Sequence, residues 1–183
     1  PEGFDAPAAL DALQTAAGSG RPVAILTTSF ALVWLLDAWP AGAAPLPSGS
    51  RMMLTGGFKG RVREVTEADL LARVRDQLGL QMADVVPEYG MTELTSQAYG
   101  RPLQTPPWLK LRVVDPSTGD NLPTGQTGYV AAFDLLNLDN VSAVLTSDLG
   151  RLDANGGLTL LGRAPDADLR GCSLTAEDLL EPA

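Results

Sequence analysis

Histidine is absent from this 183-residue chain, and cysteine occurs only once. Without histidine, the chain supplies neither a Ser-His-Asp nor a Cys-His catalytic group, nor a zinc site that uses imidazole. A single cysteine excludes an internal disulfide bond and a four-cysteine metal site. Basic residues are also scarce, since 13 Lys and Arg against 22 Asp and Glu give a net charge of −9. Such an acidic chain lacks the cationic surface that neutralises phosphates, so we expect no nucleic-acid partner.

Long hydrophobic runs are missing as well. The most apolar stretch, Val23 to Leu36, is shorter than the roughly 18–20 residues that span a bilayer, and Asp37 ends it. The chain begins at Pro1 without a basic or apolar leader, which indicates a processed chain or a part of a longer protein. We therefore expect no membrane span and a cytoplasmic location.

The first part of the chain alternates between helical and strand patterns. Ser29 and Thr66 are expected to cap the second and third helices at their N-termini, and Gly79 to end the third. This alternation predicts an α/β subdomain with a parallel sheet over residues 1–107. Its helices are expected at about 6–17, 29–39 and 66–78, and its strands at about 22–26, 52–55 and from Val85 onward.

The pattern changes near Pro106-Pro107. Beyond this point, short β patterns alternate with turns, and they predict a small antiparallel, barrel-like β unit over residues 108–163. Residues 164–183 form a polar tail that contains Cys172, with a short helix expected after Thr175. The strands of the β unit are expected at about 109–115, 128–136, 142–148 and 156–162.

The strongest chemical signal is the sequence EYGMTE at residues 88–93, which follows a β pattern. The aromatic ring of Tyr89 suits stacking on adenine, and Gly90 lets the backbone approach a nucleotide. The Thr92 hydroxyl suits donation to an α-phosphate, and the Glu93 carboxylate suits binding of Mg²⁺. A loop of ordinary polar residues is the alternative interpretation of the motif.

This motif resembles the Tyr-Gly-x-Thr-Glu motif of adenylate-forming enzymes, which include acyl-CoA synthetases and the adenylation domains of peptide synthetases. Two further segments resemble family motifs in the expected order. Residues 146–150 (TSDLG) are similar to the Thr-Gly-Asp segment, with Ser147 in place of the usual glycine, and residues 161–163 (LGR) are similar to the Gly-Arg segment. The resemblance implies that Asp148 accepts hydrogen bonds from both ribose hydroxyls and that Arg163 contacts the nucleotide.

Two other positions bear on the resemblance. Residues 52–60 (MMLTGGFKG) resemble the strand and glycine loop that form one wall of the family's adenine pocket, which implies that Gly56 and Gly57 allow close approach of the backbone. The family places an aspartate two residues after its Gly-Arg segment, at the hinge to a further domain. Here Pro165 stands at that position.

The loop GGFKG at 56–60, the motif at 88–93 and RGCSL at 170–174 together resemble the acyl-protein synthetases. These are the long-chain-fatty-acid–protein ligases of the bacterial bioluminescence fatty acid reductase complex. The resemblance implies that ATP and Mg²⁺ activate a fatty or other carboxylic acid as acyl-AMP, and that the acyl group passes to a cysteine, here Cys172. Phenylacetate-CoA ligases are the next most similar group. A buried structural thiol is the alternative interpretation of Cys172.

The family's Ser/Thr/Gly-rich phosphate loop has no counterpart in this sequence. The resemblance therefore implies the C-terminal part of an adenylate-forming large domain, an α/β fold with a parallel-sheet subdomain and a small antiparallel β unit. Its implied partners are the N-terminal portion of the same enzyme and an acyl reductase subunit. The alternative function is a non-catalytic nucleotide-binding or interaction module.

Overall fold

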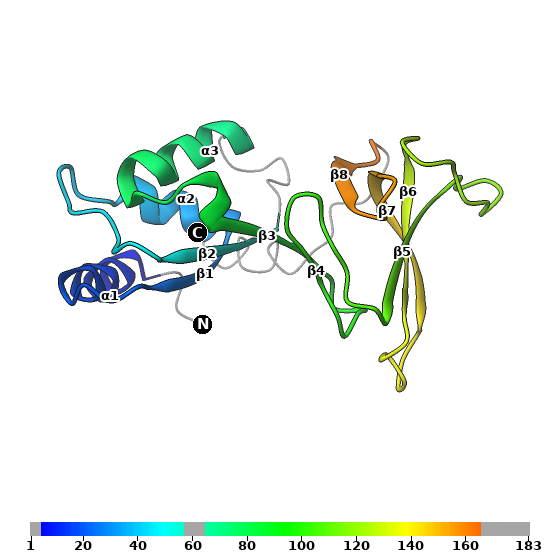
Figure 1. Cartoon of the computed structure of the whole chain (residues 1–183), viewed down its shortest axis with the longest axis horizontal. Coiled ribbons are helices and arrows are strands. Elements are labelled where there is room, and N and C mark those ends of the chain that lie inside the picture. Colours follow the sequence, from blue (N-terminus) through cyan, green and yellow to red (C-terminus); the bar gives the residue numbers. More distant parts are fainter. Residues whose placement is uncertain (1–4, 57–64, 166–183) are drawn as a thin grey trace, which may run out of the picture. The chain divides into compact units, whose positions relative to one another are not determined.

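The computed structural model describes residues 5–56 and 65–165, which form two compact units (Figure 1). The first unit extends to Val86 and the second begins at Pro87. This division lies before the composition change near Pro106-Pro107 that the sequence suggested, because residues in between pair with the second unit. Leu103, for example, forms an isolated β-bridge with Leu158.

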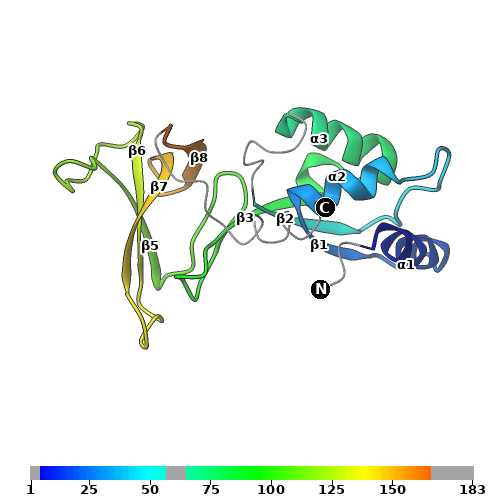
Figure 2. The same ribbon diagram turned by 180° about the vertical axis from the view of Figure 1, so that it is seen from behind.

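The described residues of the first unit form three α-helices and the strands that they accompany. Strands β1 and β2 are parallel, with Ala24 opposite Arg51 and Thr28 opposite Thr55. Helix α3 continues into a π-helical turn, Val74–Leu78, and a short 3₁₀ turn, Met82–Asp84, precedes β3. Figures 1 and 2 show α2 and α3 on the same side of β1 and β2. The elements are α1 (Ala6–Gly18), β1 (Ala24–Thr28), α2 (Ser29–Asp37), β2 (Arg51–Thr55), α3 (Glu67–Arg73) and β3 (Val85–Tyr89).

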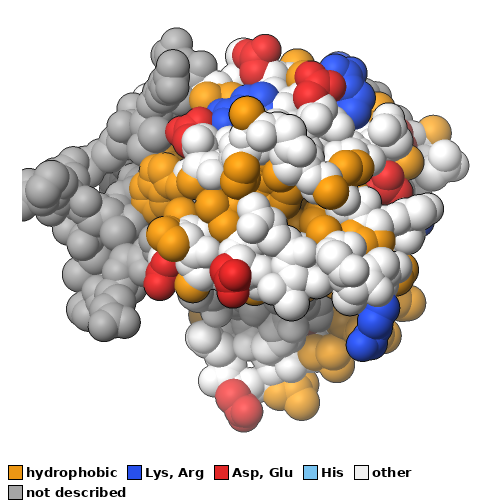
Figure 3. All heavy atoms as spheres, turned by 90° about the vertical axis from the view of Figure 1, so that its left-hand side faces the viewer, with side chains coloured by type: hydrophobic (Ala, Val, Ile, Leu, Met, Phe, Trp, Pro, Cys, Tyr) orange, Lys and Arg blue, Asp and Glu red, His pale blue; other side chains and the backbone are white. Residues whose placement is uncertain are grey.

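The core of this unit is built from the apolar faces that the sequence pattern predicted. Leu70, Val74 and Leu78 recur at helical spacing and are fully buried. They pack with α2 and β2, whose Leu32 and Met52 are also buried. Figure 3 shows further apolar side chains across the middle of one face, with acidic and basic side chains scattered around them. No helix in the described part of the chain is long and apolar enough to cross a bilayer.

The N-cap of α2 differs from the prediction. Thr28, not Ser29, caps the helix, because its Oγ1 accepts a hydrogen bond from the Ala31 amide at 3.2 Å. Strand β1 runs to Thr28, two residues beyond its predicted end, and Ser29 is already the first residue of the helix. Ser29 Oγ instead donates to the Gly56 carbonyl at 2.6 Å, and this bond ties α2 to the end of β2.

The ends of α3 agree with the sequence prediction. Thr66 Oγ1 accepts from the Asp69 amide at 3.1 Å, which is an N-cap bond. At the other end Gly79 has φ +76°, and a β-carbon there would lie 2.8 Å from Pro45 Cβ. Position 79 therefore needs glycine for two reasons: its backbone is left-handed, and it has no room for a side chain.

We expect Thr66→Ala to lower the free energy of unfolding by about 1 kcal/mol, because the Asp69 amide loses its capping acceptor. Chemical denaturation of the chain measures this change. Thr66→Ser is the matched control, since it keeps the hydroxyl. Equal losses in both variants would contradict a capping role.

The second unit contains a four-stranded antiparallel sheet in the order β5-β6-β7-β8. We expected a barrel-like unit, but in this sheet β5 and β8 are the two edge strands and do not pair with each other. Strand β4 (Ala98–Tyr99), which the sequence did not indicate, pairs antiparallel with the end of β3. Strand β7 is longer than predicted because it continues past Asp148 to Leu152, where it pairs with β8. The strands are β5 (Leu109–Val114), β6 (Gly128–Asp134), β7 (Ala143–Leu152) and β8 (Leu158–Arg163).

The fold class is therefore confirmed: an α/β part with parallel strands and an antiparallel β part. In the second unit the alternating inward residues of β5 and β6 make the core, which includes Leu109, Leu111, Val113, Val130 and Ala132. This core supports the sheet in which β7 and β8 carry two of the candidate site residues.

Candidate functional site

Three residues that belong to separate sequence motifs meet in the second unit. Tyr89 ends β3, Asp148 lies within β7, and Arg163 ends β8. Tyr89 Oη donates a hydrogen bond to Asp148 Oδ2 at 2.8 Å. Arg163 Nε lies 3.3 Å from Asp148 Oδ1, and the two residues are partners in the β7–β8 register. The carboxylate of Asp148 is thus the centre of the cluster.

Local irregularity in β7 orients Asp148. Thr146 Oγ1 donates to the Val130 carbonyl at 2.8 Å and accepts from the Asp148 amide at 3.0 Å. The register of β6 against β7 shifts between Tyr129 and Ala131. Shifts of this kind are β-bulges, which turn a side chain away from its regular direction and are frequent beside functional sites.

The cluster is partly open to solvent. The side chains of Asp148 and Arg163 are 22% and 31% exposed. Asp148 Oδ2 accepts the hydrogen bond from Tyr89 Oη, and Asp148 Oδ1 faces Arg163 Nε. A carboxylate offers about four lone-pair positions, so this one retains room for two further hydroxyl donors.

Burial raises the pKa of the Tyr89 phenol well above its usual range, and the nearby negative charge of Asp148 raises it further. Tyr89 is therefore a neutral hydrogen-bond donor at any ordinary pH. A group whose pKa is raised on folding contributes stability below its unfolded pKa, about 10, and loses that contribution as the pH rises above it.

This gives a titration test. We expect the absorbance change of tyrosinate near pH 10 to be almost the same in the wild-type chain and in Tyr89→Phe, because Tyr89 does not ionise there. Above pH 10 the wild type loses stability relative to Tyr89→Phe. If the variant lacks a third of the absorbance change, which is the share of one of three tyrosines, the buried, hydrogen-bonded phenol is ruled out.

The rest of the motif forms an exposed turn after β3. The Leu94 amide donates to the Met91 carbonyl at 3.1 Å and closes the turn. Thr92 and Glu93 are exposed, and Thr92 Oγ1 donates to Glu93 Oε2 at 3.2 Å. Gly90 is closely packed, since a β-carbon would lie 2.5 Å from Glu88 Oε1 and 2.7 Å from Gln97 Cγ, and these side chains would have to shift to admit it.

Glu93 suits a magnesium ion that is shared with a substrate. Among the residues that the structure describes, no group of three or more His, Cys, Asp or Glu side chains is arranged to hold a metal. Mg²⁺ is commonly held by one or two carboxylates, with water and substrate phosphates completing its shell. An exposed carboxylate beside a hydroxyl donor fits that arrangement.

The other predicted site residues fall at the edge of the described chain or beyond it. Gly56 follows β2 in the first unit with φ +71°, and no atom lies within 4 Å of the position of a β-carbon there. Gly57 and Cys172 lie outside the described residues. The adenine-loop and acyl-acceptor roles therefore stay predictions.

Among the residues of this region that sequence analysis missed is Asp134 at the end of β6. It is fully buried, and its carboxylate accepts hydrogen bonds from the segment that follows the motif. The alternation along the strand could have identified it. Val130, Ala132 and Asp134 occupy every second position of β6, and the first two are core residues, so Asp134 also points inward. A charged residue at an inward strand position is a sign of a buried polar network.

No family model and no curated protein sequence matches the chain. Its fold matches those of solved adenylate-forming enzymes. ATP-bound MatB from Rhodopseudomonas palustris is 20% identical with a TM-score of 0.62, over 91% of this chain and 34% of that one. The amide bond synthetase McbA from Marinactinospora thermotolerans is 21% identical with a TM-score of 0.61, over 87% of this chain and 34% of that one.

A third match is the O-succinylbenzoate Coenzyme A synthetase MenE from Bacillus subtilis, in complex with ATP and magnesium ion. It is 20% identical with a TM-score of 0.60, over 92% of this chain and 36% of that one. The chain thus spans about a third of the length of the structures that it matches. At these identities the comparison establishes a shared fold.

Proposed function

We propose that this chain supplies the nucleoside-binding part of an adenylate-forming acid ligase. The observation that carries the proposal is the meeting of Tyr89, Asp148 and Arg163, which come from three motifs in the order of that superfamily. The shared fold supports it, because the matched structures include ligases solved with bound ATP.

In the proposed site each side chain has a defined task. Asp148 accepts the two ribose hydroxyls in charge-assisted hydrogen bonds. Arg163 orients that carboxylate, and Tyr89 fixes its second oxygen while its ring forms a wall for adenine. Thr92 donates to the α-phosphate, and Glu93 holds Mg²⁺, which when bound supplies neutralisation of the phosphate charge.

The proposed reaction begins with attack of a carboxylate oxygen on the α-phosphorus of ATP. The new bond gives acyl-AMP, and the bond to pyrophosphate breaks, so pyrophosphate leaves with the electron pair. This sequence contains no segment that resembles the superfamily's cradle for the β- and γ-phosphates. We propose that a further portion of a longer chain provides it, with the Ser/Thr/Gly-rich loop of the superfamily.

The finer assignment is a fatty acid substrate and the thiol of Cys172 as acceptor. The thiolate attacks the acyl carbonyl, a thioester forms, and AMP leaves. The resemblance of residues 170–174 to the acyl-protein synthetases supports it. An amide bond synthetase and a Coenzyme A synthetase share this fold, so the fold does not identify the molecule that accepts the acyl group, and an experiment must do so.

Acid-dependent exchange of pyrophosphate into ATP tests the activation step. We expect exchange by the full-length protein with one or more of a panel of fatty and aromatic acids, and none by the 183-residue chain alone. Exchange by the isolated chain would contradict a separate phosphate loop. Adenosine binding without exchange by the full-length protein would overturn the ligase proposal and favour a non-catalytic nucleotide-binding module.

Labelling identifies the acceptor. Full-length protein incubated with ATP and a radioactive fatty acid should gain label that hydroxylamine removes, and Cys172→Ser should abolish the label and keep pyrophosphate exchange. Label that persists in the variant would place the acceptor elsewhere. Transfer of the label to added CoA instead would favour the phenylacetate-CoA-ligase-like alternative.

A further inference from the structure

The side chain of Asp134 fixes the backbone that follows the exposed Thr92-Glu93 turn. Its Oδ2 accepts hydrogen bonds from the Thr95 amide, the Thr95 hydroxyl and the Ser96 amide, each at 3.0 Å. Its Oδ1 accepts from the Leu136 amide at 3.1 Å. One fully buried carboxylate thus joins residues 95–96 to the start of the β6–β7 hairpin.

A second side chain of the same hairpin holds the turn itself. Asn137 Nδ2 donates to the Glu93 carbonyl at 2.7 Å and to the Val141 carbonyl at 2.8 Å. Trp108 adds a third link, since its Nε1 donates to Ser96 Oγ at 2.9 Å. Backbone groups of residues 93, 95 and 96 are therefore bonded to side chains of the β6–β7 hairpin, and Trp108, directly before β5, bonds the Ser96 side chain, all within the second unit.

Burial of the Asp134 carboxylate costs desolvation free energy, so the structure must offer compensating interactions. Desolvation alone raises the pKa of a buried carboxyl, yet the pKa of Asp134 is lowered, because the amides of Leu136, Thr95 and Ser96 and the Thr95 hydroxyl donate to its charged form. An apolar residue at this inward strand position would fill the core without that cost. Apart from the Leu136 amide of its own hairpin, the donors to this carboxylate come from one segment, the residues after Glu93.

The exposure pattern along this segment shows what the bonds accomplish. Leu94 and Ser96 are buried, whereas the neighbouring Thr92 and Glu93 are exposed. Upstream, Tyr89 is held by Asp148. The two exposed side chains therefore project from a backbone that is fixed on both sides, which is the arrangement expected of groups that must meet a ligand without reorganisation.

We propose that Asp134 and Asn137 are positioning residues, which hold Glu93 and Thr92 where they meet the magnesium and phosphate end of the nucleotide. This inference rests on the proposed function. It separates the site into two parts: Tyr89, Asp148 and Arg163 bind the nucleoside, and the hairpin sets the turn that acts on the phosphates. Loss of the hairpin bonds should damage the second part and spare the first.

The sharpest test compares Asn137→Asp with Asn140→Asp in the full-length protein. Both variants add one carboxylate to the same hairpin. Asn137→Asp replaces the donor to the Glu93 carbonyl with an acceptor, whereas an aspartate at 140 still accepts from the Val141 amide, as Asn140 Oδ1 does at 2.8 Å. We expect kcat for pyrophosphate exchange to fall by about tenfold or more in Asn137→Asp and to change by less than about twofold in Asn140→Asp.

Two measurements without turnover distinguish positioning from a purely structural role. Adenosine affinity in magnesium-free buffer should stay within about twofold in both variants, because the nucleoside residues are untouched. Amide hydrogen exchange at residues 94–96 should accelerate by about tenfold in Asn137→Asp only. If Asn137→Asp lost adenosine affinity and pyrophosphate exchange in parallel, the proposal would be overturned. An unchanged kcat for pyrophosphate exchange in Asn137→Asp would also overturn it.

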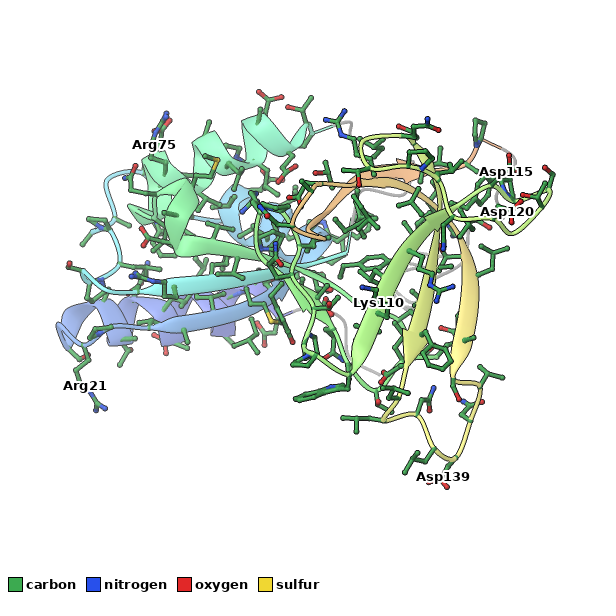
Figure 4. All side chains as sticks on the ribbon, turned by 45° about the vertical axis from the view of Figure 1, so that its right-hand side comes forward. Arg21, Arg75, Lys110, Asp115, Asp120 and Asp139 are labelled. Carbon is green, nitrogen blue, oxygen red and sulfur yellow. The ribbon has the colours of Figure 1, made fainter. Side chains whose placement is uncertain are left out.

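Asp134→Asn gives a second variant, with Asp115→Asn as its control in a surface turn of the same unit (Figure 4). The neutral amide removes the charge that the Thr95 and Ser96 donors meet, so the Mg²⁺ concentration for half-maximal exchange should rise severalfold with adenosine affinity retained. An unchanged Mg²⁺ requirement would overturn the proposal. Pyrophosphate exchange by the unsubstituted protein is measured before any variant. If it is absent, the proposed function is wrong, and this result is distinct from a failure of the positioning proposal.

Discussion

Asp148→Asn in the full-length protein should raise the KM for ATP by about tenfold or more. A hydrogen bond to a charged group is worth about 1.5–3 kcal/mol, and about 1.4 kcal/mol corresponds to a tenfold change in affinity. The asparagine keeps an oxygen for Tyr89 Oη but no longer carries the charge that faces Arg163. Steady-state kinetics of pyrophosphate exchange with varied ATP measures the effect.

Asp115→Asn is the matched control for this prediction. Asp115 also accepts hydrogen bonds in the second unit, from the Ser117 amide at 2.8 Å, but it does so in the turn between β5 and β6 (Figure 4). The control removes one negative charge from the same acidic chain, so it tests for a general electrostatic effect on ATP. An unchanged KM in Asp148→Asn would mean that Asp148 only links the end of β3 to β7.

The second large effect concerns the packing beside Asp148. Gly150→Ala should lower the free energy of unfolding by about 1–3 kcal/mol, because an added β-carbon has no space. It would lie 2.8 Å from Leu158 Cδ1, 3.0 Å from Val130 Cγ2 and 3.1 Å from the Thr159 carbonyl oxygen. Leu158 and Val130 are buried core residues, so neither side chain can move aside cheaply.

Gly18→Ala is the control for this substitution, and its expected effect has the opposite sign. Gly18 is the last residue of α1, and no atom lies within 4 Å of the position of its β-carbon. Alanine in a helix is favoured over glycine by about 0.5–1 kcal/mol. Urea denaturation of both variants measures the pair. A loss in Gly18→Ala, or no loss in Gly150→Ala, would contradict the packing argument.

Local patterns in the sequence determined many elements of the fold. The Thr66 cap, the spacing of Leu70, Val74 and Leu78, and the terminal Gly79 define α3 because each acts within a few residues along the chain. Alternation of apolar residues likewise predicted the β unit. Local patterns failed at α2, where Thr28 is the cap and the Ser29 hydroxyl instead donates to the distant Gly56 carbonyl.

The candidate site divides in the same way. Motif order in the sequence identified Tyr89, Asp148 and Arg163 as candidate ligands of one nucleotide. It gave no reason to expect that Tyr89 donates to Asp148, because the two residues are 59 positions apart and their contact depends on the bulged register of β7.

Only the tertiary structure shows which segment the β6–β7 hairpin holds. Asp134 and Asn137 lie about forty residues after the segment that they hold, as shown by sequence separations of 39 for Asp134 and Thr95 and 44 for Asn137 and Glu93. A sequence specifies helices and strands through neighbours a few residues away. It specifies which backbone amides meet a buried carboxylate only through the packing of the whole unit, since that packing sets both the desolvation and the donors.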